Sequence, residues 1–307
     1  MAPMKLQFKS ATMLLILFVP NMHAQNFWQH TPFQGQGGSI CIDQNDRIFV
    51  GDGNQGVYRS TDNGENWMQV NNGLTRTNIG SMATGPNGNV FAGSDLGALY
   101  RSTDGGESWR WVSDTTAGYV ESVAIDSMGT IFYGTLAYFG STANLFRSTD
   151  NGVTWISLNL GVIPRDISRL ALKSPGNIFA SVDTFGVFHS TDNGTTWTQS
   201  LNNITVTALD VNRDGHVLAG TFGSLILRTT NDGGSWIPVN SGFPGQLVRS
   251  LSHNASDHMY ASVHHVTFGW GLLYRSTDDG VNWLDITTGI DSSAVYSIAS
   301  SLSTGIY

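Results

Sequence analysis

The chain has 307 residues and a formal net charge of −8. Only 12% of its residues are charged, 11% are aromatic, and glycine occurs 36 times. This composition is typical of a turn-rich all-β protein and disfavours long helices and disorder. The negative charge makes nucleic acid and anionic membrane surfaces poor partners. The single cysteine, Cys41, excludes an intramolecular disulfide.

Residues 1–24 have the composition of a secretory signal peptide. Lys5 and Lys9 provide the positive start, residues 11–19 are apolar but too short for a comfortable membrane span, and Ala24 precedes a tolerable cleavage point. An uncleaved anchor is the alternative. We therefore expect a secreted or cell-surface protein with no membrane span after cleavage. The lack of disulfides favours a bacterial source.

A ten-residue motif first occurs at residues 58–67, Tyr-Arg-Ser-Thr-Asp-Asn-Gly-Glu-Asn-Trp, and returns at 100–109, 146–155, 188–197, 227–236 and 274–283. Alternating residues before it predict a strand. Gly64 and its counterparts allow a positive φ, and Asp62 and its counterparts can accept backbone N–H bonds across a turn. Each copy therefore predicts a hairpin turn, and the near-regular interval predicts a repeat architecture.

Each repeat predicts four antiparallel strands, which in the first unit are residues 38–42, 47–51, 56–60 and 67–70. The first strands of the next five units are expected at 79–84, 121–125, 168–172, 207–211 and 249–253. A seventh unit starts at 294–299, and its pattern breaks off at Tyr307. We predict an all-β propeller of seven four-stranded blades, truncated at the C-terminus, with Trp28 in the outer strand of the last blade. A six-bladed ring with the tail packed outside it is the alternative.

The motif closely resembles the Asp-box, or BNR repeat, of sialidases and other β-propellers, and the resemblance covers nearly all of residues 25–307. The chain also resembles the Asp-box propellers related to the photosystem II assembly factor family, which bind protein partners. The resemblance implies that the motif is a structural turn on the face away from the ligand. The residues with this structural role are Asp62, Asp104, Asp150, Asp192, Asn231 and Asp278.

Two units carry longer loops between their second and third strands, at residues 135–144 and 263–271. Strand alternation places these loops at the end of the blade opposite the motif. Aromatic residues there could stack on a sugar or grip a peptide, and histidines could hydrogen-bond, although such loops can also bury their own aromatics. The candidate ligand-binding residues are Tyr138, Phe139, His264, His265, Phe268 and Trp270. The two histidines lack a third ligand, so no metal and no cofactor are expected.

Two functions remain open. A recognition propeller would bind a glycan or a protein through the face opposite the motif. A glycoside hydrolase, either sialidase-like or an Asp-dependent glucanase, is the alternative. A glucanase would use two of Asp52, Asp95 and Asp183, which follow second strands. The sequence favours the interpretation of these three residues as solvated loop residues over a catalytic role. The sialidase's Arg-Ile-Pro motif is absent near the first blade, and the arginines of the repeat lie at the wrong end, so binding is favoured over hydrolysis.

Overall fold

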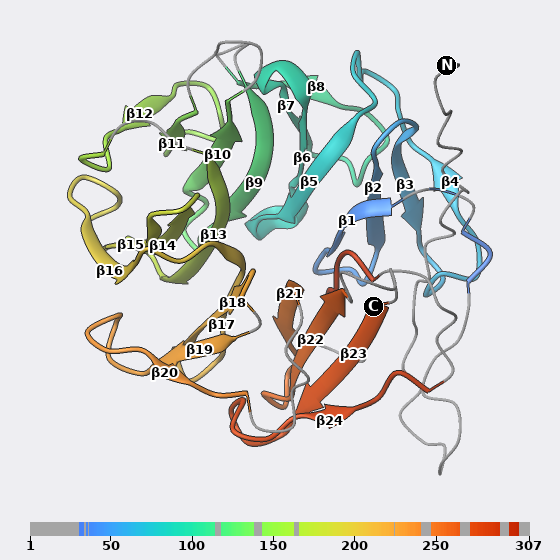
Figure 1. Ribbon diagram of the computed structural model, residues 1–307. Coiled ribbons are helices and arrows are strands. Elements are labelled where there is room, and N and C mark those ends of the chain that lie inside the picture. The colour runs from blue at the N-terminus through green and yellow to red at the C-terminus, as the bar shows by residue number, and fades with distance from the viewer. Residues whose placement is uncertain are drawn as a thin grey trace, which may run out of the picture.

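The computed structural model describes residues 31–33, 35, 37–113, 118–137, 143–162, 166–223, 225–240, 247–264, 271–288 and 295–300. These residues form six antiparallel sheets of four strands each, arranged around a central axis (Figure 1). Within each sheet the strands follow the order of the chain, so the first strand lies at the axis and the fourth at the rim.

The first three blades have the following bounds. Blade one contains β1 (Gly37–Ile42), β2 (Ile48–Asp52), β3 (Gly56–Ser60) and β4 (Met68–Gln69). Blade two contains β5 (Ile79–Thr84), η1 (Pro86–Gly88), β6 (Val90–Ser94), η2 (Asp95–Gly97), β7 (Leu99–Ser102) and β8 (Arg110–Trp111). Blade three contains β9 (Tyr119–Ile125), β10 (Ile131–Leu136), β11 (Leu145–Ser148) and β12 (Ile156–Leu158).

The last three blades repeat this order. Blade four contains β13 (Ile167–Ser174), β14 (Asn177–Val182), β15 (Gly186–Ser190) and β16 (Thr198–Asn202). Blade five contains β17 (Val206–Val211), β18 (Val217–Thr221), β19 (Ile226–Thr229) and β20 (Ile237–Pro238). Blade six contains β21 (Leu247–His253), β22 (Met259–His264), β23 (Gly271–Ser276) and β24 (Leu284–Asp285).

The prediction of seven blades is wrong, because the described residues form six four-stranded blades. Residues 295–300, which we expected to start a seventh blade, join no four-stranded sheet. Apart from an isolated bridge at Ser300, this short segment forms no strand. Val295 and Ile298 contact blade six, and Ala299 contacts blade one. The tail therefore lies between these blades rather than outside the ring. Trp28 and residues 301–307 lie outside the described residues.

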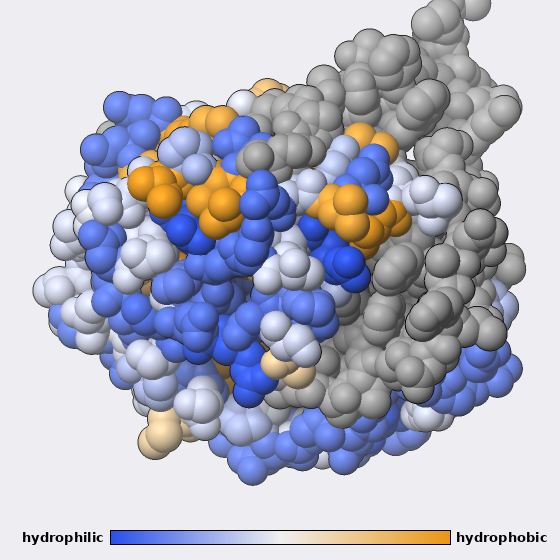
Figure 2. Space-filling view, turned by 90° about the horizontal axis from the view of Figure 1, so that it is seen from below, coloured by the Kyte–Doolittle hydropathy of each residue, from blue (hydrophilic) through white to orange (hydrophobic). Residues whose placement is uncertain are grey.

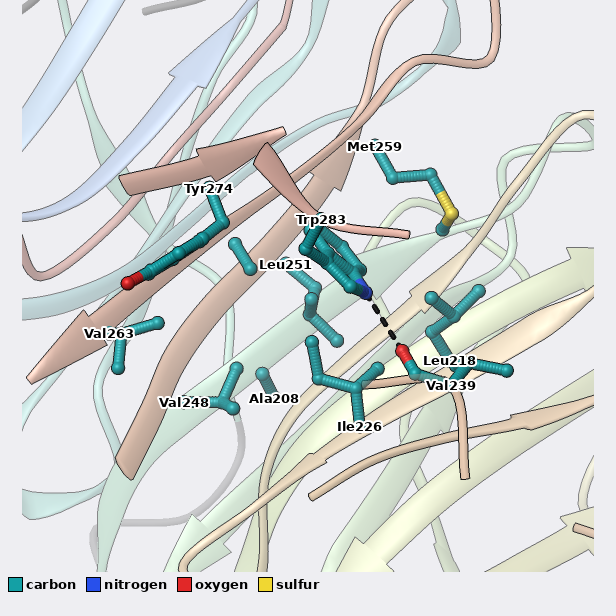
Figure 3. Packing of buried hydrophobic residues seen from close by; sticks show 11 residues of the cluster. Ala208, Leu218, Ile226, Val239, Val248, Leu251, Met259, Val263, Tyr274 and Trp283 are labelled. Atoms are coloured by element: carbon teal, nitrogen blue, oxygen red, sulfur yellow. Dashed lines mark hydrogen bonds between the residues drawn. The ribbon is translucent and has the colours of Figure 1, made fainter. Parts of the chain in front are cut away.

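The hydrophobic core is divided into layers between neighbouring blades. One layer joins blades five and six, where the buried side chain of Trp283 packs among residues of both and its indole Nε1 donates to the carbonyl of Val239 at 2.8 Å (Figure 3). Similar layers join blades one and two, two and three, three and four, and four and five. Five layers therefore join the six blades in sequence, and residues of the tail pack on blades six and one instead.

Arginines before the turns of blades one, two, three and five join each of these blades to the next. The Nη1 atom of Arg59 donates to the carbonyl of Gly105 at 2.6 Å, and that of Arg147 donates to Asn193 in the same way at 2.6 Å. Arg101 and Arg228 make the equivalent bonds to Asn151 and Asp279. Between blades four and five, Lys173 replaces the arginine with a 2.5 Å ion pair to Asp232. These cations therefore have a structural task that explains their place in the repeat.

The outer surface is mostly polar, with apolar residues in small separate groups on the side shown in Figure 2. Among the described residues, several exposed apolar side chains lie in the outermost strands, such as Met68, Ile156 and Leu284. Four of the outermost strands have only two residues, which leaves little free edge for pairing with another chain. No helix among the described residues is long and apolar enough to cross a membrane.

Candidate functional site

The six repeated turns have one geometry. In the second blade, the Ser102 hydroxyl accepts the N–H of Gly106 at 2.8 Å and donates to Asp104 Oδ1 at 2.7 Å. Asp104 in turn accepts the backbone N–H of Ser108 at 3.0 Å. Gly105 and Gly106 both have positive φ, at 72° and 90°. The same bonds recur at every other copy. The aspartate thus closes the hairpin.

The fifth turn shows that this task does not require a negative charge. Asn231 accepts the N–H of Ser235 at 2.9 Å and the hydroxyl of Thr229 at 2.9 Å, as the aspartates do elsewhere. Its amide nitrogen donates to the Ser235 hydroxyl at 3.1 Å, replacing the charge-assisted bond. A position that works equally well with an amide is a hydrogen-bonding position in a turn, and nothing in its geometry requires acid–base chemistry.

We expect Asp104→Ala to destabilise the propeller by about 1 kcal/mol, the value typical of a lost side-chain cap, and Asp104→Asn to be nearly neutral. Burial would raise the pKa of the Asp104 carboxyl, but bonds from Ser108 and Ser102 outweigh it and lower the pKa from 3.8 to about 2. The charged form's contribution is therefore present above pH 3.8 and is lost as the pH falls toward 2. Urea titrations at pH 7 and pH 3 measure both effects; equal losses in the two variants would contradict this account.

The face opposite the turns carries the loops between second and third strands. Asp52 is fully buried there and accepts the N–H groups of Asn54 and Gln55, both at 2.8 Å. Asp95 is 3.7 Å from the guanidinium of Arg76. Asp183 is half-buried and donates its backbone N–H to the carbonyl of Asp166. Asp52 and Asp95 thus hold their own loops, and none of the three lines the central channel described below.

Of the six candidate ligand-binding residues in the long loops, only His264 lies within the described residues. Tyr138, Phe139, His265, Phe268 and Trp270 lie outside the described residues. His264 is described: it ends β22, is half-buried, and pairs with Leu247 and Gly271 in blade six. Its place at the end of the second strand puts it on the face opposite the turns.

A polar channel of about 330 Å³ opens along the axis, lined by the first halves of the inner strands. Each inner strand contains a β-bulge at its start, where one extra residue is left unpaired against the second strand. The bulged residues are Gly38, Gly80, Glu121, Ser168, Thr207 and Arg249. Four of them, Gly38, Gly80, Glu121 and Arg249, line the channel directly. The bulges therefore bring a variable position to the axis.

Three charged side chains line this channel in the described structure. Glu121 accepts an ion pair from Arg169 at 3.1 Å, which joins blades three and four. Arg249 lies with its guanidinium 5.6 Å from the ring centre of Tyr296 in the tail segment. Arg249 makes no hydrogen bond or ion pair within the described part of the chain, and its Nε is buried without a partner. The channel thus contains two cations and one anion.

None of Glu121, Arg169 and Arg249 is among the candidate site residues of the sequence analysis. The available signal was an apolar–x–small pattern at the start of inner strands, as in Ile79-Gly80-Ser81 and Val248-Arg249-Ser250. Strict alternation cannot assign the middle residue, because the bulge changes which way it points. Within the described residues no group of three or more His, Cys, Asp or Glu side chains could hold a metal ion.

The sequence matches no protein-family model, and no curated protein matches it. Solved structures do resemble it. A GH74 enzyme from Niastella koreensis aligns with a TM-score of 0.71 and 17% identity over 86% of this chain and 49% of that chain. Virginiamycin B lyase from Staphylococcus aureus aligns with a TM-score of 0.72 and 12% identity over 86% and 88%. The chain spans about half the length of the GH74 enzymes it resembles.

A third neighbour is YCF48 from Cyanidioschyzon merolae, with a TM-score of 0.63 and 17% identity over 87% of this chain and 91% of that chain. Another YCF48 structure, bound to D1 peptide, has a TM-score of 0.50 and 16% identity over 66% and 64%. These neighbours are β-propeller proteins with different activities. At such low identities the likeness shows the fold and leaves the activity to the site.

Proposed function

We propose that this chain is an exported recognition propeller of the Asp-box type, which binds a protein or glycan ligand at the channel mouth opposite the repeated turns. The observation that carries the proposal is the polar axial channel, whose lining changes from blade to blade while the turns and interblade cores stay the same. A rigid ring with a variable mouth is suited to recognition. The signal-like residues 1–24 support export.

The carboxylates support binding over glycoside hydrolysis. Hydrolysis of a glycosidic bond by the common mechanism requires two carboxyl groups flanking the bond. Among the described residues that line the channel, Glu121 is the only carboxylate, and Arg169 holds it in an ion pair. Asp52 and Asp95 serve their own loops. A hydrolase therefore remains the alternative function, but no pair of carboxylates among the described lining residues favours it.

The comparisons favour a peptide over a glycan as the ligand. The likeness to YCF48 extends over most of both chains, and one YCF48 structure is bound to a peptide. The likeness to GH74 enzymes leaves about half of each enzyme unmatched. The greater overlap with YCF48 than with the GH74 enzymes supports a peptide ligand.

The test combines binding and turnover screens with a channel plug. Gly38 lines the channel, and a Cβ there would meet nothing closer than 4.0 Å, so Gly38→Phe should fold and fill the mouth. Gly223, in the loop between β18 and β19 on the same face, has nothing within 4 Å of its Cβ, so Gly223→Phe is a matched control.

We expect ligands from peptide and glycan arrays to bind the wild type and Gly223→Phe, and to lose at least tenfold in affinity with Gly38→Phe. Binding that survives the plug would contradict the channel as the site. Turnover of a β-glucan or a sialoside by the wild type would establish the hydrolase instead and direct attention to Asp52, Asp95 and Asp183.

A further inference from the structure

The charge of the channel differs from that of the whole chain. The chain carries a formal net charge of −8, but the described channel lining has the guanidinium groups of Arg169 and Arg249 against the single carboxylate of Glu121. Because Arg169 and Glu121 neutralise each other at 3.1 Å, the unbalanced charge belongs to Arg249. A cation inside a narrow mouth concentrates field lines toward the solvent and attracts anions.

Arg249 is also distinguished from the other arginines by what it contacts. Arg59, Arg147 and Arg228 each donate to a carbonyl in the next blade, so their guanidinium groups are occupied. Arg249 contacts only the face of Tyr296 among the described polar and aromatic partners. The buried Nε without a partner is common to all four of these arginines, so the difference lies in the Nη atoms. A half-buried guanidinium without an acceptor is costly, and a ligand oxygen that supplies the acceptor removes that cost.

The backbone on both sides of Arg249 determines where its side chain points. The bulge between Val248 and Ser250 turns the residue toward the axis. Val248 on one side is fully buried against blade five. Ser250 on the other side accepts the N–H of Ile298 at 3.2 Å, which ties β21 to the segment that carries Tyr296. Arg249 therefore lies on a strand, β21, and a hydrogen bond joins this strand to the segment that carries Tyr296.

We propose that Arg249 anchors a carboxylate of an acidic peptide ligand in the axial channel; this inference rests on the proposed function of the channel mouth. A planar guanidinium matches a carboxylate with two parallel N–H···O bonds, which are stronger than neutral hydrogen bonds. The Tyr296 ring braces the guanidinium from behind. Arg249 lies over this ring, the only aromatic ring among the described lining residues. The ring is still 44% exposed, so the test below includes saccharide probes as well as peptides.

The test uses probes that differ only in the carboxylate. The full chain is titrated by fluorescence anisotropy with a labelled hexaglutamate peptide, its hexaglutamine counterpart, galacturonate trimer and neutral galactotriose, the two peptides being capped at both ends. The variant Arg249→Gln removes the anchor. Arg110→Gln is the matched control, because Arg110 is exposed on the outer strand β8 and its loss changes the net charge equally.

We expect hexaglutamate to bind the wild type and Arg110→Gln at least tenfold more tightly than hexaglutamine, and to lose about tenfold to a hundredfold with Arg249→Gln, the range of a charged hydrogen-bonded pair. The preference should weaken with added salt.

Equal binding of both peptides, or unchanged binding by Arg249→Gln, would overturn the anchor while leaving a channel ligand in place. Tighter binding of galacturonate than of hexaglutamate would overturn the peptide assignment. If none of the four probes binds, the carboxylate anchor is wrong; if Gly38→Phe also leaves all array binding intact, so is the channel site.

Discussion

Trp283→Ala is expected to destabilise the propeller by about 3–5 kcal/mol, the range for truncating a buried tryptophan. The side chain is 5% exposed and packs in the layer between blades five and six, beside Leu218, Val239 and Met259. The substitution would leave a cavity between two blades and a buried carbonyl at Val239 without its indole donor. Equilibrium unfolding in urea, followed by fluorescence of the remaining tryptophans, measures the loss.

Two further substitutions separate the causes of that effect. Trp283→Phe keeps most of the packing and removes only the N–H, so we expect a smaller loss of about 1–3 kcal/mol. Trp197 is only half-buried, and its indole donates to Gly194 within its own turn at 2.9 Å. Trp197→Ala should therefore cost less than Trp283→Ala. Similar losses at the two positions would show that the bond to the preceding blade is unimportant.

The local structure could be predicted from the sequence because each repeat contains all the residues that form its own turn. Ser102, Asp104 and Gly106 lie within five residues, and their bonds close the hairpin without help from distant parts of the chain. The same holds at the other copies, so the strands on either side of the turns were expected close to their observed positions. Repetition then indicated a propeller of four-stranded blades, which the structure confirms.

The number of blades could not be predicted in the same way. Ring closure depends on how many inner strands fit around the axis and on which residues fill the last gap, and both are long-range properties. The start of a seventh repeat at residues 294–299 looked like a blade because its pattern matched an inner strand. In the structure this segment instead places Ile298 against blade six and Ala299 against blade one. A sequence pattern therefore located the segment correctly but misjudged what it builds.

The candidate site was harder to predict for a related reason. Loop length and aromatic content favoured residues 135–144 and 263–271, whereas the described polar channel is formed by bulged residues in regular strands. A bulge depends on the pairing partner, because two residues of one strand face one residue of the other. From the sequence alone, Arg249 cannot be distinguished from other residues of an alternating strand, because the pairing of that strand is not known. The Arg169–Glu121 pair likewise joins residues 48 positions apart.

The contact between second strands and the next blade separates residues that maintain the fold from those free to vary. Gly51, Gly93, Gly134 and Gly220 occupy equivalent positions in four blades, and each faces a β-branched residue among the first two of the next inner strand. The bulged position follows directly after that β-branched residue. Close packing thus requires a β-branched residue opposite the glycine. The bulged residue that follows it can differ between blades, as Glu121 and Arg249 do.

Gly134→Ala is expected to destabilise the propeller by about 3 kcal/mol, at the upper end of the range for overpacking. A Cβ there would lie 2.5 Å from Cγ2, 2.7 Å from Cβ and 2.9 Å from the backbone oxygen of Ile167. Ile167 starts β13 and is itself 3% exposed, so neither its side chain nor its backbone can withdraw without moving blade four away from blade three. Urea unfolding again gives the free energy.

Ser181 provides the matched control, because it occupies the position of Gly134 in blade four and already carries a Cβ. Its hydroxyl is buried and has no hydrogen-bond partner in the described structure. Ser181→Ala should therefore be neutral or slightly stabilising, since an unsatisfied polar group is removed without changing the packing. If Gly134→Ala proves as harmless as Ser181→Ala, close contact between second strands and the next blade does not set the spacing of the ring. A large loss at Gly134 alone would show that blades three and four can approach to their observed distance only because Gly134 has no Cβ.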